Sequence, residues 1–321
     1  MKDAKELIYY SSKAPSGHNS QPWKFKIREN TIEIYPDFSY ALPIVDPNNR
    51  ELFISLGTAT KNICIASSHF GYECSWEIKK NLENVYYIVI KLHSSKNIVK
   101  DKLFQYIEKR QTNRSIYNGK RIDNQILTQL QKLTYKNSVG LYFFQNGEAY
   151  FQTIKEAIIK GNKIQMSDSA FKKELLSWIR FNKKEVNNLQ NGLTYKVMGS
   201  PSTPRFIGET IVKLFLSPEK QNKSDIKKIE SSSHFIVLTT KNNTVTEWIM
   251  LGITLQNLLL KLTELKIACA YLNPPCELES LSVQLQKQLP VNNEYPSIIL
   301  RIGYAENVPF SPRKDVEKII E

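Results

Sequence analysis

The sequence predicts an α+β fold built from two diverged half-repeats, and three patterns in the chain support this prediction. Short runs that alternate apolar and polar residues are typical of half-buried strands. Two longer, largely apolar runs, 52–70 and 245–265, are typical of buried helices. Each half shows an early helix, a middle strand, a buried helix with a glycine (Gly57 or Gly252) and a later strand, the order expected of a duplicated unit.

In the first half, apolar spacing and turn residues define each expected element. A helix is expected over 3–13, where apolar residues share one face, and Pro15 ends it. The buried helix at 52–70 is expected to end at Gly71, which suits a C-terminal cap. Strands are expected at 24–27, 31–36, 72–78 and 85–93, the first two joined as a hairpin.

The second half is expected to contain more helix, together with one long segment that has no period. Helices are expected at 100–109, at 123–133 with Asp123 as the cap, at 150–161 and at 169–180. Strands are expected at 139–144, 234–240 and 295–305. Residues 182–210 show no clear period, so we expect a long loop or lid, which a compact domain rarely carries without a function.

Composition and charge favour a globular protein with an anionic ligand. Hydrophobic residues make up 41% and charged residues 23% of the 321 residues, which is ordinary for a packed protein. The formal net charge of +13 favours a phosphate, a dinucleotide or nucleic acid as a partner. The lysine pairs are spread along the chain as on a solvated surface, so we expect no nucleic-acid interface.

We expect no membrane segment, no metal site and a cytoplasmic location. The most apolar run, 248–262, is too short and too often interrupted by polar residues to span a bilayer. The N-terminus has no apolar signal core. The cysteines form no CxxC pair and have no histidines nearby, so we expect buried free thiols in a reducing compartment. They are Cys64, Cys74, Cys269 and Cys276.

No residue pattern indicates a catalytic group carried by the protein itself. The motifs GxSxG and HExxH, a Walker loop and GxGxxG after a strand are all absent. The histidines lie far apart in the sequence and are interpreted as structural residues: His18, His69, His93 and His234. A reaction would therefore take its reactive group from a cofactor.

Two segments carry the groups expected of a site for a phosphate and a heterocycle. Arg110, Thr112 and Arg114 alternate in an extended segment, so their side chains point the same way and suit a phosphate clamp. A basic surface loop would have the same composition. Residues 14–23, APSGHNSQPW, expose backbone and side-chain amides that can contact the edge of a planar heterocycle. A plain loop entering a strand would look the same.

Taken together, the two segments resemble the FMN-dependent nitroreductase family. APSxxNxQPW resembles the loop that lies against the flavin in that family, and RQTNRSIYNGKRIDNQIL resembles its arginine-rich segment. The resemblance implies a nitroreductase-like fold with a mainly antiparallel central sheet and flanking helices. It also implies that Arg110, Thr112 and Arg114 hold the FMN phosphate. Four residues would face the ring or the ribityl chain: Ser16, His18, Asn19 and Gln21.

The order of the two segments is inverted relative to the family, in which the arginine-rich segment comes first. Family members are homodimers whose sites take one segment from each subunit, so this chain resembles two fused subunits, as in the single-chain Acg-like branch. Residues 1–100 would form a first half with the loop. Residues 101–321 would form a second half with the clamp and the lid at 182–210. The fusion implies a pseudo-dimer with one FMN site, and further homo-oligomerisation stays open.

The resemblance extends to two further stretches. Leu272 and Asn273 align with the family's segment that passes the flavin N5 atom, although Pro274 stands where a glycine is usual and removes an N–H group. Arg313, in the tail, aligns with a third phosphate ligand. Lys314 is a weaker candidate for the same role.

Two functions follow from the resemblance. In the first, the flavin N5 atom carries the chemistry, no protein residue is catalytic, and NAD(P)H is used to reduce nitroaromatic, quinone or similar acceptors. In the second, the lid covers the flavin and the protein stores or sequesters FMN. The retained flavin contacts favour the enzyme. The resemblance of residues 171–182 to the lidded branch favours the store.

Overall fold

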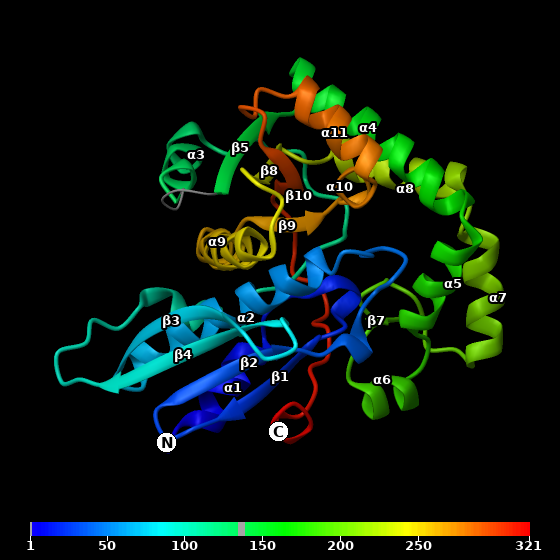
Figure 1. Cartoon of the computed structure of the whole chain (residues 1–321). Coiled ribbons are helices and arrows are strands. Elements are labelled where there is room, and N and C mark those ends of the chain that lie inside the picture. Colours follow the sequence, from blue (N-terminus) through cyan, green and yellow to red (C-terminus); the bar gives the residue numbers. More distant parts are fainter. Residues whose placement is uncertain (1, 134–138) are drawn as a thin grey trace.

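Two four-stranded antiparallel sheets organise the chain in the computed structural model, which describes residues 2–133 and 139–321. The first sheet has the strand order β1-β2-β4-β3, and the second has the order β5-β8-β10-β9. Both therefore run first, second, fourth, third in chain order, and a 20-residue helix connects the second strand to the third in each. This shared topology confirms the predicted α+β fold with antiparallel strands and two half-repeats, each half with its own sheet (Figure 1).

The first half follows the predicted elements closely. Its elements are α1 (Ala4–Ser12), β1 (Trp23–Ile27), β2 (Thr31–Pro36), α2 (Arg50–His69), β3 (Tyr72–Lys80) and β4 (Tyr86–Ser94), with 3-10 turns at Gly17–Asn19 and Phe38–Tyr40. At the start of the second half, the helix expected at 100–109 is only a 3-10 turn, Lys102–Tyr106. In the predicted hairpin, Trp23 pairs with Pro36 and Ile27 with Ile32. Alternate residues of β2 are buried against the core, as the alternation in the sequence predicts.

The second half contains the second sheet and most of the helices. In chain order, its earlier elements are α3 (Asn124–Gln131), β5 (Val139–Gln145), α4 (Ala149–Ser167), α5 (Ser169–Trp178), β6 (Ile179–Arg180), α6 (Lys183–Leu189), β7 (Leu193–Thr194), α7 (Arg205–Phe215) and α8 (Pro218–Glu230). The later elements are β8 (His234–Thr240), α9 (Val245–Glu264), β9 (Ala268–Tyr271), α10 (Pro274–Glu277), α11 (Glu279–Gln288), β10 (Tyr295–Gly303) and a 3-10 turn at Val316–Lys318. Asp123 caps α3 as predicted, because its Oδ1 accepts the Gln125 N–H at 2.7 Å.

The two long helices α2 and α9 cross where the two halves meet, and each has a glycine at the crossing point. Gly57 and Gly252 are each the eighth residue of their helix, and they face each other. A Cβ atom on Gly57 would overlap the carbonyl oxygen of Ile249, and one on Gly252 would overlap the carbonyl oxygen of Ile54. Both isoleucines are fifth in their helices, so the crossing has the pseudo-two-fold symmetry of a fused dimer. One apolar core runs through both halves at this crossing.

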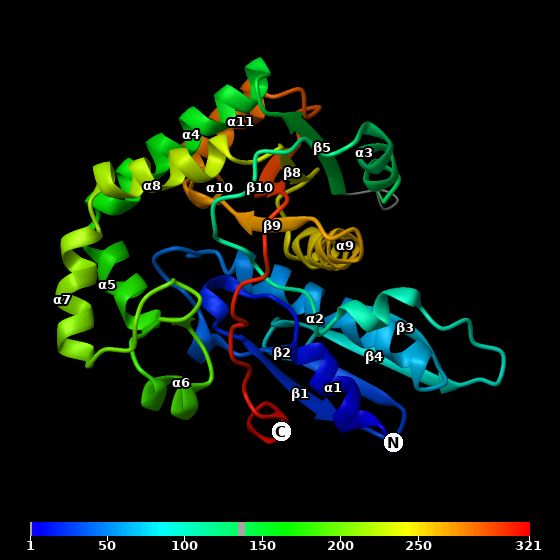
Figure 2. The same ribbon diagram turned by 180° about the vertical axis from the view of Figure 1, so that it is seen from behind.

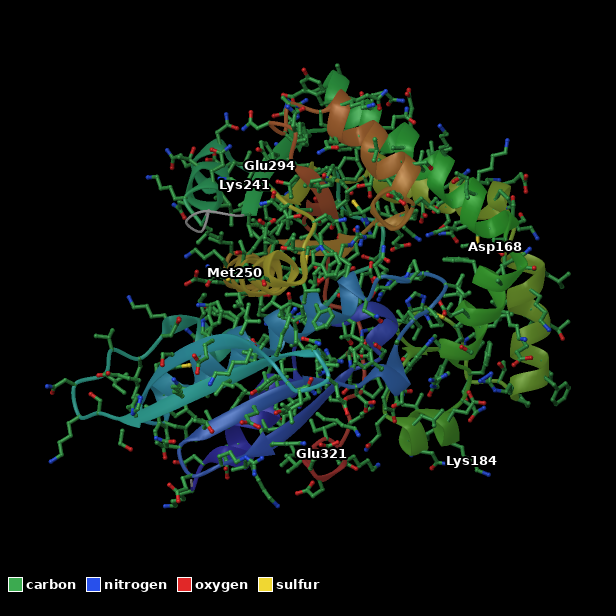
Figure 3. All side chains as sticks on the ribbon, viewed as in Figure 1. Asp168, Lys184, Lys241, Met250, Glu294 and Glu321 are labelled. Atoms are coloured by element: carbon green, nitrogen blue, oxygen red, sulfur yellow. The ribbon has the colours of Figure 1, made fainter. Side chains whose placement is uncertain are left out.

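The C-terminal tail returns from the second half to the first. The Phe25 N–H of β1 donates to the Ile319 carbonyl at 2.7 Å, and the Glu321 N–H donates to the Phe25 carbonyl at 2.8 Å. Lys24 forms an ion pair of 2.8 Å with Glu321. Figures 2 and 3 show this tail running from β10 past the long helices to the first sheet, with Glu321 at its end. The last residues of the second half therefore extend the sheet of the first.

The prediction of a long irregular loop at 182–210 is wrong in its secondary structure. The segment contains α6 and the short strand β7, and α7 begins at Arg205. Asn182 caps α6 by accepting the Glu185 N–H at 3.0 Å. These elements are too short to show a period in the sequence. The sequence pattern also does not predict the strand β9 or the helices α7, α8, α10 and α11. The segment lies beside the first half at one side of the molecule, together with α5 (Figure 1).

Candidate active site between the two halves

A cavity of about 420 Å³ lies where the two halves, the 182–210 segment and the tail meet. Both motifs identified in the sequence border it, although about ninety residues separate them in the chain. Nine of the ten residues predicted to bind a cofactor line this cavity: Ser16, His18, Asn19, Arg110, Thr112, Arg114, Leu272, Asn273 and Arg313. The structure therefore brings the loop, the arginine-rich segment, the β9–α10 connection and the tail around one space.

The loop at 14–23 reaches the cavity through an uncommon backbone conformation. His18, Asn19 and Gln21 have φ values of 49°, 56° and 55°, in the left-handed region that residues other than glycine rarely adopt. The Ser16 Oγ accepts the Gln21 N–H at 2.9 Å, which closes the turn. Gly17 lies against α2, because a Cβ at this position would be 2.9 Å from Glu51 Oε2. Such conformations cost free energy and are concentrated at binding sites.

Gln21 is the predicted site residue that does not line the cavity. Its side chain is fully buried, and its Nε2 donates to the Gln190 carbonyl at 2.8 Å while its Oε1 accepts the Lys314 N–H at 2.8 Å. It therefore ties the loop to the 182–210 segment and to the tail. Lys314 does not line the cavity either. Its Nζ lies 3.3 Å from the Gln21 carbonyl oxygen and over the ring of Tyr40.

Three guanidinium groups form the cationic end of the cavity. Arg110 and Arg313 both donate to the Lys13 carbonyl, at 3.0 Å and 3.2 Å, while Arg114 is exposed to the cavity. The Nε atoms of Arg110 and Arg313 are buried and have no hydrogen-bond partner in the part of the chain that the structure describes. Among the described residues, no carboxylate forms an ion pair with any of the three.

The electrostatics of this cationic end suit an anion. Burial and the charge of Arg110 lower the pKa of Arg313, which means that the free protein holds these charges at a cost. An anion with several acceptor oxygens would satisfy the unpaired Nε groups and remove this cost. The hydroxyl of Thr112, between the two arginines of the segment, lines the same space.

Asn19 connects the loop to the cationic end and to the 182–210 segment. Its Oδ1 accepts from Arg313 Nη1 at 2.7 Å, so it orients the guanidinium. Its Nδ2 donates to the Gly192 carbonyl at 3.3 Å and to the Pro312 carbonyl at 3.2 Å. The Gly192 N–H in turn donates to the Asn19 carbonyl at 3.2 Å. Asn19 therefore positions the arginine in addition to lining the cavity.

His18 is uncharged at neutral pH. Burial first, and then the charge of Arg114, lower the pKa of its imidazole to about 4. The neutral ring offers one N–H donor and one acceptor nitrogen to the cavity. A proton-donating imidazolium is therefore not available at this position.

The segment Leu272–Pro274 is held to the opposite wall by its own side chains. Asn273 Oδ1 accepts the Ile299 N–H at 2.9 Å, and its Nδ2 donates to Glu51 Oε1 at 2.9 Å. The polar atoms of Asn273 are thus engaged within the protein. Pro274 begins α10 and contributes no N–H. Leu272 is almost fully buried and adds an apolar surface to the cavity.

Two carboxyl groups at the cavity were not predicted from the sequence. Glu51 lies in the first turn of α2, and Glu277 is the last residue of α10. Both line the cavity, close to Asn273. Nothing in the sequence indicates that these residues meet, because the contact depends on how α10 docks on α2. No group of three or more metal-ligating side chains occurs in residues 2–133 and 139–321. Within the same ranges, no helix is long and apolar enough to cross a membrane.

The 182–210 segment contributes an apolar wall. Leu193, Val197 and Met198 line the cavity. The segment is fastened at its base, because Tyr195 donates its N–H to the Arg180 carbonyl at 2.8 Å. That this wall acts as a lid over a ligand stays a prediction.

Comparison with known proteins extends the resemblance over nearly the whole chain. Two Mycobacterium tuberculosis proteins (strains CDC 1551 and H37Rv), whose names provisionally assign them as NAD(P)H nitroreductases, are each 21% identical to it, and the match covers 98% of this chain and 90% of theirs. No protein-family model matches the chain.

Solved structures of nitroreductases are similar at lower levels. The FMN-dependent nitroreductase NfnB from Mycobacterium smegmatis, in complex with NADPH, is 14% identical with a TM-score of 0.42; the match covers 67% of this chain and 94% of NfnB. A provisionally assigned nitroreductase from Anabaena variabilis is 11% identical with a TM-score of 0.48; the match covers 86% of this chain and 69% of that protein. Over almost its full length, the chain is therefore similar to curated proteins named as NAD(P)H nitroreductases.

Proposed function

We propose that this protein binds one FMN in the cavity between its halves and uses NAD(P)H to reduce nitroaromatic, quinone or similar acceptors. One observation carries the proposal. Three guanidinium groups, none of which pairs with a carboxylate of the described residues and two of which have a buried Nε without a partner there, meet the amide-rich loop across one cavity. A cavity of about 420 Å³ falls within the usual range of small-molecule sites, roughly 300–1,000 Å³.

The residues present fit the chemical groups of FMN. Arg110, Arg114 and Arg313, with the Thr112 hydroxyl, would hold the phosphate through charge-assisted hydrogen bonds. Ser16 and His18 would contact the ring or the ribityl chain, and Leu272 would supply an apolar contact. Asn19 would act on the phosphate end through Arg313. Bound FMN would supply hydride-transfer chemistry at its N5 atom, while the protein contributes binding, orientation and exclusion of water.

The first experiment separates binding from turnover. The purified chain is stripped of flavin, titrated with FMN, and then mixed anaerobically with NADPH or NADH in a stopped-flow instrument. We expect saturable FMN binding and bleaching of the flavin absorbance by at least one of the two nucleotides. A chain that binds no FMN would refute the proposal. If the chain binds FMN but neither nucleotide bleaches the flavin absorbance, only the proposal of FMN binding would stand.

A second function, storage of FMN, is favoured by the apolar wall. Leu193, Val197 and Met198 line the cavity, and two pairs of residues, Asn19 with Gly192 and Gln21 with Gln190, hold the base of the wall closed. Hydride transfer needs donor and acceptor atoms at roughly 3–3.5 Å, so a wall over the flavin would exclude the nicotinamide.

Replacing the wall tests this alternative. If the wall is the gate, wild-type bleaching is slow, and replacing residues 193–198 by Gly and Ser accelerates bleaching about tenfold or more, equivalent to about 1.4 kcal/mol in the barrier. Fast wild-type bleaching would reject storage. An unchanged rate in a variant that still holds FMN would reject the wall as the gate.

We further propose that the chain divides functionally into residues 1–100, which supply the loop, and residues 101–321, which supply the phosphate ligands. The repeated strand order and the symmetric helix crossing support this division. The C-terminal tail of the second half also pairs with strand β1 of the first half. We place the protein in the cytoplasm because its cysteines are free thiols, which suits a reducing compartment.

A further inference from the structure

Glu51 and Glu277 form a pair of carboxyl groups on the wall of the cavity. Both are half-buried, and neither forms an ion pair with any described residue. Each accepts a hydrogen bond from a neutral amide: Asn273 Nδ2 donates to Glu51 Oε1 at 2.9 Å, and Gln165 Nε2 donates to Glu277 Oε2 at 2.6 Å. Ionising both carboxyl groups costs free energy, because no ion pair with a described residue offsets their loss of hydration and their mutual repulsion.

The surroundings favour retention of one proton at neutral pH. Burial first, and then the charges of Glu277 and Asp46, raise the pKa of Glu51 to about 8. Burial also raises the pKa of Glu277. Arg50 is the cation that opposes these effects, without reaching ion-pair distance. The titratable groups around Glu51, from the helix start, the loop and the β9–α10 connection, are Asp46, Arg50, His18, Tyr271, Cys276 and Glu277.

The hydrogen-bond network assigns the proton to one atom. Asn273 Oδ1 is occupied by the Ile299 N–H at 2.9 Å, so the group that Asn273 presents to Glu51 must be its NH₂. Glu51 Oε1 is therefore an acceptor, and a proton on Glu51 resides on Oε2. This atom lies against Gly17 of the loop, where a Cβ atom would be only 2.9 Å from it, so the residue beside Oε2 has to lack a side chain. Asn273 is a positioning residue for this carboxyl group.

We propose that Glu51, which shares one proton with Glu277, donates that proton from Oε2 to an uncharged oxygen acceptor in the cavity, a quinone carbonyl or a nitro group. This inference rests on the proposed function, in which NAD(P)H is the source of two electrons and one hydrogen as hydride. The O–H bond of Glu51 breaks, an O–H bond forms on the reduced acceptor, and Glu51 is left as a carboxylate. Water in the cavity returns the proton, so the pair is restored after each turnover.

The shared proton is tested without flavin, by the pH dependence of stability. A carboxyl group whose folded pKa is raised stabilises the fold fully below its unfolded value of 4.5 and loses this contribution as pH rises to about 8. Gln is neutral throughout, so Glu51→Gln should gain stability relative to wild type as pH rises from 5 to 8.5. Urea unfolding of the apo-protein measures this gain. Glu279→Gln, an exposed carboxyl group on α11, is the matched control and should show no such trend.

Proton donation is tested on the FMN-loaded protein with two acceptors. Menadione takes up protons on two-electron reduction, whereas ferricyanide takes up an electron alone. For Glu51→Gln at pH 7, we expect the ratio of menadione to ferricyanide reduction to fall about tenfold or more. An unchanged ratio overturns proton donation, and a flat stability difference overturns the shared proton. Failure of the wild type to oxidise NADPH refutes the proposed function instead, while the stability measurement still decides the shared proton.

Discussion

Replacement of Arg114 is the cleanest test of the phosphate end of the cavity. Its guanidinium group is exposed to the cavity and makes no hydrogen bond or ion pair with the described residues. Arg110 and Arg313, in contrast, also hold the Lys13 carbonyl. Arg114→Ala therefore removes a ligand contact without removing a contact that stabilises the fold.

The expected magnitude follows from the contact that is lost. A hydrogen bond to a charged group contributes about 1.5–3 kcal/mol, which corresponds to about a 10- to 150-fold change in Kd. Arg114→Ala should weaken FMN binding by this factor without lowering the Tm of the apo-protein. Arg110→Ala combined with Arg114→Ala should weaken binding about a hundredfold or more.

Quenching of FMN fluorescence on binding to the apo-protein provides the assay. The matched control is Lys183→Ala with Lys184→Ala, which removes two charges from exposed positions on α6; Figure 3 shows Lys184 on the outer side of this helix. The control should bind FMN as tightly as the wild type. Wild-type affinity in the Arg114→Ala protein would show that the phosphate lies elsewhere and would refute the assignment of this end of the cavity.

Three further outcomes are expected. Purified protein should contain about one FMN per chain, released on denaturation, and two per chain on absorbance analysis would contradict a single site. Gly57→Ala and Gly252→Ala should each lower the free energy of unfolding by about 1–3 kcal/mol or more, because the added Cβ overlaps a backbone carbonyl of the facing helix; denaturant unfolding measures this. Cys64 and Cys74, whose Sγ atoms lie 2.7 Å apart, should form a disulfide with diamide, detected as the loss of two titratable thiols; unchanged thiol counts would show that the pair cannot close.

The sequence by itself determined the elements whose pattern is local. Alternation predicted the strands of the first sheet, and apolar runs predicted α2 and α9, because burial of one face imposes a short period on neighbouring residues. The two motifs carry their chemistry in consecutive residues, so the resemblance of the loop and of the arginine-rich segment could be recognised. The short elements α6, β7 and β9 could not, because they span too few residues to repeat a pattern.

Only the tertiary structure decided which side chains meet. Gln21 and Asn19 are two residues apart in one motif, yet the left-handed turns direct Gln21 into the protein and leave Asn19 beside the cavity. Glu51 and Glu277 belong to different halves of the chain and become partners only because α10 docks near the start of α2. Burial and neighbouring charge arise from packing between distant segments, so the proton at this site is a property of the fold that no local pattern records.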